Sequence, residues 1–161
     1  MADPIDFELA SAHKYFSATC FNRAWDLIDM PQRSAEEEEA MVLLAMASLW
    51  HWTQRADCSG QNRALGTWQV SRALALARQA EGARLFAQKS LELSQSEGPF
   101  YLGYAHEALA RAAFVSGDPA QARKELEQAR RLLDQVIDAE EREGLEKDLD
   151  GLQASLEAGA D

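Results

Sequence analysis

The chain has 161 residues, of which 47% are hydrophobic, and 27 acidic residues against 16 basic ones give it a formal net charge of -11. This length and hydrophobic content are typical of one folded domain with its own core. Because nucleic acids and anionic membranes are bound through clustered lysine and arginine, the negative charge argues against both as partners.

The first part of the chain, residues 5–55, predicts a pair of helices. Apolar residues at steps of three or four predict one stripe on a helix that stops at Pro31. This stripe consists of Leu9, Ala12, Phe16, Cys20, Ala24 and Leu27. Ser34 and Glu37 have the spacing of a capping box that starts the second helix. Residues 40–50 are apolar almost throughout, so we expect a central helix that is covered on most sides.

The middle of the chain predicts three further helices. A third helix is expected over residues 62–79, and Gly82 marks a short break before a fourth. Gly98 and Pro99 then predict a break, after which a fifth helix begins.

The clearest boundary in the sequence is the tripeptide Gly117-Asp118-Pro119. Glycine can adopt the left-handed conformation that ends a helix, aspartate can cap the next one, and proline fits the first helical position. Asp138 similarly caps a last helix over residues 138–157, which carries leucines on one stripe and charges elsewhere. One apolar face and one solvated face are what the end of a helical array requires.

Small residues repeat at the same spacing in the fourth and sixth predicted helices, which indicates an internal repeat. The matching residues are Ala83, Ala87 and Ser90 in the first copy and Ala122, Leu126 and Ala129 in the second. The second copy resembles a tetratricopeptide repeat through Leu109, Ala110, Ala113, Gly117, Asp118, Ala122, Leu126 and Ala129. Residues 47–52, 65–75 and 104–112 are similar to segments of uncharacterised bacterial tetratricopeptide-like proteins.

That resemblance implies an all-α, right-handed array of about seven antiparallel helices in a single domain, residues 1–161. Residues 62–135 would form two extended repeats, residues 5–55 a divergent N-terminal helix pair, and residues 138–157 a capping helix. In tetratricopeptide proteins the first helices of successive repeats line a concave groove. The resemblance assigns to this groove Leu65, Trp68 and Arg72 from the third helix, and Tyr104, Glu107, Arg111 and Phe114 from the fifth.

Each of these two sets steps by three or four residues, so each lies on one helix face. An aromatic side chain beside a guanidinium suits the capture of a peptide carboxylate. We therefore expect a non-enzymatic interaction module that binds a protein or peptide partner. A purely structural interpretation stands beside it, in which Trp68 is a core residue, Glu107 and Arg111 form an exposed helix pair, and Arg72 closes the groove by pairing with Glu107.

Signals for catalysis are few. The sequence has no phosphate-binding glycine loop, no His-Glu-x-x-His and no Gly-x-Ser-x-Gly elbow, and Cys20 and Cys58 are far apart in no metal-ligand spacing. We expect no metal and no cofactor. The sequence also has no signal peptide and no apolar run long enough to span a bilayer, so we expect a cytoplasmic protein.

Histidine 51 provides the alternative functional hypothesis. It lies between Trp50 and Trp52 at the end of the central helix, where a histidine bonded to a backbone carbonyl is the more common role. The alternative is a small-molecule or enzymatic pocket around His51, Trp68 and Arg72, next to Trp52. Self-association into a homo-oligomer is a third hypothesis.

Overall fold

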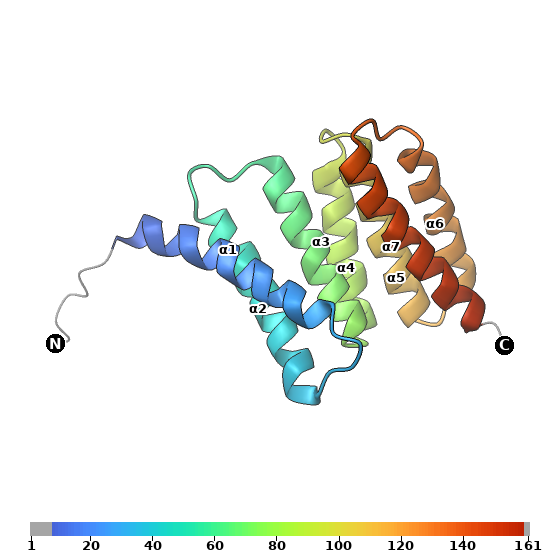
Figure 1. Ribbon diagram of the computed structural model, residues 1–161, viewed down its shortest axis with the longest axis horizontal. Coiled ribbons are helices and arrows are strands. Elements are labelled where there is room, and N and C mark those ends of the chain that lie inside the picture. The colour runs from blue at the N-terminus through green and yellow to red at the C-terminus, as the bar shows by residue number, and fades with distance from the viewer. Residues whose placement is uncertain (1–7, 160–161) are drawn as a thin grey trace.

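The computed structural model describes residues 8–159, which contain seven α-helices and no β-strand. The all-α prediction and the number of helices are therefore confirmed. In chain order the helices are α1 (Leu9–Ile28), α2 (Ala35–Thr53), α3 (Gly60–Leu76), α4 (Ala80–Ser94), α5 (Pro99–Val115), α6 (Pro119–Leu133) and α7 (Ala139–Ala158) (Figure 1). None of the described helices is long and apolar enough to cross a membrane.

The helices pack mainly against their neighbours in the chain. The closest pairs are α1 with α2, α3 with α4, and α5 with α6. Contacts between pairs are made by α2 with α3, by α4 with α5 and by α3 with α5, whereas α1 touches α3 only lightly, and α7 packs on α5 and α6. Figure 1 shows the result as an elongated row, with α1 and α2 at one end and α6 and α7 at the other.

The predicted helix boundaries are mostly confirmed, because they depend on local chemistry. The capping box of Ser34 and Glu37 is formed in both directions. Gly117 has a positive φ of 82°, and the Asp118 side chain accepts a hydrogen bond from a backbone N–H in the first turn of α6. Asp138 caps α7 in the same way.

The break between α3 and α4 differs from the prediction. It lies at residues 77–79, where Arg78 takes the left-handed conformation with a φ of 57°, and Gly82 is inside α4. A Cβ atom at Gly82 would lie 3.3 Å from the Leu74 side chain, so this glycine permits a close approach of α4 to α3.

The core is formed by two clusters, and α3, α4 and α5 contribute buried residues to both. Small residues on α3 to α6 allow the helices to approach closely, and the leucine stripe of α7 is buried against α5 and α6. The stripe consists of Leu145, Leu149, Leu152 and Leu156, each at most 3% exposed. Its predicted role as the apolar face of the last helix is confirmed.

Two predictions for the N-terminal pair are wrong. In α1, Leu9 and Phe16 are 61% and 44% exposed, because α2 packs on the neighbouring face that carries His13 and Ser17. In α2, the apolar run is not covered on most sides. Among the described helices, α1 and α3 alone pack against α2, so its opposite face is exposed.

Candidate functional site

The central residues of the predicted groove lie at the contact between α3 and α5 and are buried. Trp68 is 3% exposed and Glu107 is fully buried. The indole Nε1 of Trp68 donates a hydrogen bond to Glu107 Oε2 at 2.8 Å. Trp68 is therefore a core residue, and Glu107 is a buried carboxylate.

Two partly buried arginines lie beside the Glu107 carboxylate and balance its charge. Arg111, one turn further along α5, donates from Nε to Glu107 Oε1. Arg72 Nη1 lies 4.0 Å from Glu107 Oε1 and 2.8 Å from Asp148 Oδ1 on α7. The hydroxyl of Tyr104 donates to the second Asp148 oxygen at 3.1 Å. We call Trp68, Arg72, Tyr104, Glu107, Arg111 and Asp148 the buried network.

The network also shifts proton affinities. Burial opposes the charge of Arg72, but the carboxylates of Glu107 and Asp148 outweigh this effect and raise the pKa of Arg72. Burial and the Asp148 carboxylate raise the pKa of Tyr104 well above its ordinary value. Arg72 therefore stays charged and Tyr104 stays neutral throughout the physiological range.

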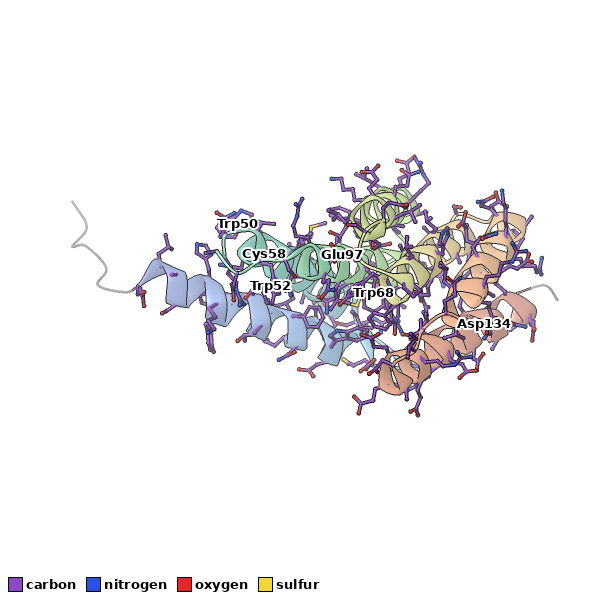
Figure 2. The ribbon with its side chains drawn as sticks, turned by 90° about the horizontal axis from the view of Figure 1, so that it is seen from above. Trp50, Trp52, Cys58, Trp68, Glu97 and Asp134 are labelled. Carbon is purple, nitrogen blue, oxygen red and sulfur yellow. The ribbon has the colours of Figure 1, made fainter. Side chains whose placement is uncertain are left out.

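Aromatic contacts extend the network to α1. The ring of Trp68 lies between those of Trp25 and Tyr104, with centroid distances of 5.6 Å and 4.5 Å. The guanidinium of Arg72 lies 5.3 Å from the Trp25 ring centroid. Figure 2 shows Trp68 near the middle of the molecule. Side chains from α1, α3, α5 and α7 thus meet here and close the centre of the predicted groove.

Two pockets lie at the ends of the α3 face that carries Leu65, Trp68 and Arg72. Beyond Trp68, a pocket of about 160 Å³ lies between α1 and α3, and Leu65 and Trp52 line it. Beyond Arg72, a pocket of about 150 Å³ lies between the ends of α3, α5 and α7, and Arg111 and Phe114 line it. We call these the α1–α3 pocket and the α5–α7 pocket. Their full linings are Ala18, Phe21, Asn22, Trp52, Asn62, Leu65 and Gly66, and Ala75, Leu76, Arg111, Phe114, Val115, Leu152 and Ser155.

His51 belongs to a different cluster. Its Nδ1 lies 2.9 Å from Nδ1 of His13 on α1, and the rings of Phe16 and Trp50 lie 5.3 Å and 4.8 Å away. No hydrogen bond or aromatic contact joins His51 to Trp68 within residues 8–159. The structure therefore separates the residues of the alternative pocket, and of these only Trp52 lines a cavity with Leu65.

The histidine contact predicts a pH dependence of stability. Burial and the nearby His13 lower the pKa of His51 from its ordinary value of 6.5. A base whose pKa is lower in the folded state than in the unfolded state stabilises the fold at pH values above its unfolded pKa. This stabilisation is lost as the pH falls through the folded pKa. We expect the urea midpoint to fall as the pH is lowered below 6.5. The variant His51→Gln should show a flatter profile, whereas His106→Gln, which leaves the His13–His51 contact in place, should retain the His51 contribution.

Asp148 of the buried network and Trp25, whose ring contacts Trp68 and Arg72, are absent from the sequence-based set. Asp148 follows Leu145 by three residues and precedes Leu152 by four, so it lies at the edge of the buried stripe of α7 rather than on the solvated face. That spacing could have predicted the position of Asp148 from the sequence. No sequence pattern predicted the role of Trp25, because its contact with Trp68 depends on how α1 lies across α3.

Comparisons with known proteins do not assign this arrangement to a family. Within residues 8–159, no group of three or more His, Cys, Asp and Glu side chains is placed to hold a metal ion. No family model matches the chain, and neither a curated protein nor a solved structure matches it significantly.

Proposed function

We propose that the chain is a tetratricopeptide-like interaction module that binds a protein or peptide partner. In this proposal α1, α3 and α5 are the first helices of three successive pairs in a right-handed array, and α7 covers the last pair. The close packing of α1 with α2, α3 with α4 and α5 with α6 supports it, as do the contacts of α3 with α5 and of α5 with α7.

The observation that carries the proposal is the pair of pockets on one stripe of α3. This stripe has residues at steps of three or four, namely Leu65, Trp68, Arg72 and Leu76. Leu65 and Leu76 line the two pockets, while Trp68 and Arg72 between them belong to the buried network. Each pocket has a mostly apolar lining and the size of a single side chain. Such pockets suit the anchoring side chains of a peptide better than a whole small molecule, which needs about 300 Å³ or more.

The spacing of the pockets constrains the ligand. An α-helix rises about 1.5 Å per residue, so Leu65 and Leu76 are separated by about 16 Å along α3. An extended peptide covers that distance with about five residues. The partner should therefore present two apolar side chains about five residues apart, with polar backbone crossing the network between them.

The mode of recognition differs from the capture of a carboxylate. Arg72 already faces Glu107 and Asp148, and Arg111 already binds Glu107. Neither guanidinium is available to a partner's carboxylate without breaking the network. Insertion of apolar side chains is therefore the proposed source of affinity.

Blocking each pocket from its rim tests this proposal. Ala18→Phe and Ser155→Phe place a ring at exposed positions that line the α1–α3 and α5–α7 pockets, so the core remains intact. Ala154→Phe, at the exposed neighbouring position of α7, is the matched control. Peptides would be selected from a random display library with the wild-type protein and measured by fluorescence anisotropy.

We expect the selected peptides to share two apolar residues about five positions apart. Each blocked variant should bind them about tenfold or more weakly, because a buried apolar side chain contributes about 1.5–3 kcal/mol. The Ala154→Phe control should bind like the wild type. Equal binding by both blocked variants, or no enrichment from the library, would rule out the pockets as the binding site.

A further inference from the structure

The exposed face of α2 has the spacing of a helix-packing seam. Residues on this face follow one another at alternating steps of three and four, and every one is exposed: Glu36, Glu39, Leu43, Met46, Trp50 and Thr53. Leu43, Met46 and Trp50 are 59%, 37% and 55% exposed. This alternation is the pattern by which one helix packs along another. The seam begins with two carboxylates and continues with three large apolar side chains.

Cations flank the other end of this seam. A shallow groove runs from the C-terminal half of α2 to α4, which do not pack against each other, and Leu49 and Phe86 contribute to its apolar lining. Arg63 and Lys89 line the groove with a single acid, Glu92. Neither cation forms an ion pair within residues 8–159. The exposed face of α2 is thus acidic at its N-terminal end and apolar in the middle, and cations from α3 and α4 lie beside its C-terminal end.

We propose that this face binds a second copy of the chain, with the two α2 helices antiparallel about a two-fold axis near Leu43 and Met46. A two-fold interface requires a surface that is complementary to itself. With this axis, Glu36 of each copy lies opposite Thr53 of the other, which lines the groove together with Lys89, and the apolar side chains meet at the centre. A parallel arrangement would bring the four carboxylates together, so the charges select the antiparallel one.

The size of the face sets the expected strength of the dimer. The 19 residues of α2 form a helix of about 28 Å, so the interface lies at the small end of specific interfaces. Leu85, which is 49% exposed, lies one turn before Lys89 on α4 and extends the apolar area. We therefore expect a reversible dimer with a micromolar dissociation constant rather than a permanent one.

Sedimentation velocity of the full chain between about 5 and 500 µM tests the proposal over the range in which such a dimer dissociates. The wild type should shift from monomer to dimer. Met46→Glu should remain monomeric throughout, because it places a charge at the centre of the seam. Ile137→Glu, at a 99% exposed position between α6 and α7, should dimerise like the wild type. Circular dichroism checks that the variants keep their helix content.

A charge exchange tests the antiparallel pairing. Glu36→Lys and Lys89→Glu should each weaken the dimer about tenfold, and the double variant should restore it, since the opposite charges then face each other again. A wild type that stays monomeric at every concentration would overturn the proposal, even if a host protein binds this face. A dimer that survives Met46→Glu would also overturn it, and a double variant as weak as the single ones would exclude this register.

Discussion

Replacing Glu107 with alanine should lower the free energy of unfolding by about 3 kcal/mol, because it leaves buried positive charge without its counter-ion. Glu107 is fully buried, and it accepts hydrogen bonds from both Trp68 and Arg111. Without it, the Trp68 indole N–H loses its acceptor inside the core, and Arg111 loses the one ion pair that it forms within residues 8–159. Urea denaturation followed by circular dichroism measures the change.

The chain offers a matched control for this experiment. Glu127 and Arg131 on α6 form an ion pair with the same spacing as Glu107 and Arg111, but their side chains are 63% and 62% exposed. Glu127→Ala should therefore change the unfolding free energy by less than about 0.5 kcal/mol. Glu107→Gln, which keeps an acceptor for Trp68, should be less destabilising than Glu107→Ala. Similar small losses for Glu107→Ala and Glu127→Ala would contradict the structural role of the network.

The second large effect is expected at the contact between α5 and α7. A Cβ atom at Gly103 would lie 2.6 Å from Cδ2 of Leu145, whose side chain is fully buried and cannot move away freely. Overpacking of this kind costs about 1–3 kcal/mol, which exceeds the gain of about 0.5–1 kcal/mol from replacing a helical glycine with alanine. Gly103→Ala should therefore destabilise the protein in thermal or urea unfolding.

Gly151 provides the opposite case within α7. A Cβ atom there would meet no other atom within 4 Å, so Gly151→Ala should gain the helix-propensity term alone and stabilise the protein by about 0.5–1 kcal/mol. The two glycine substitutions are expected to have opposite signs. Stabilisation by Gly103→Ala would show that α7 is not held as closely to α5 as the structure indicates.

These predictions share one feature of the molecule, which is that α7 packs against α5 and contributes Asp148 to the buried network. Its leucines are buried against α5 and α6, while Asp148 pairs with Arg72 of α3. The same helix contributes Leu152 and Ser155 to the α5–α7 pocket. In the proposed function, α7 therefore both stabilises the array and forms one wall of the binding site.

Most helix boundaries follow from the amino-acid sequence alone. Ser34 with Glu37, Gly117 with Asp118, and Asp138 act within one turn of their own positions, so their roles need no information from distant residues. The leucine stripe of α7 was predictable for the same reason, since spacing along one helix defines which residues share a face. The sequence also placed Leu65, Trp68 and Arg72 on one stripe of α3.

Which helix faces are covered depends on how the helices pack together. Whether Trp68 lines a groove or fills it depends on Trp25 and Asp148, which come from helices far away in the chain. The apolar run of α2 likewise gave no indication that Met46 and Trp50 are exposed. The sequence of one helix is the same whether or not another helix packs on its hydrophobic side chains. Burial depends on the arrangement of several helices in space, and a single helix's sequence does not contain that arrangement.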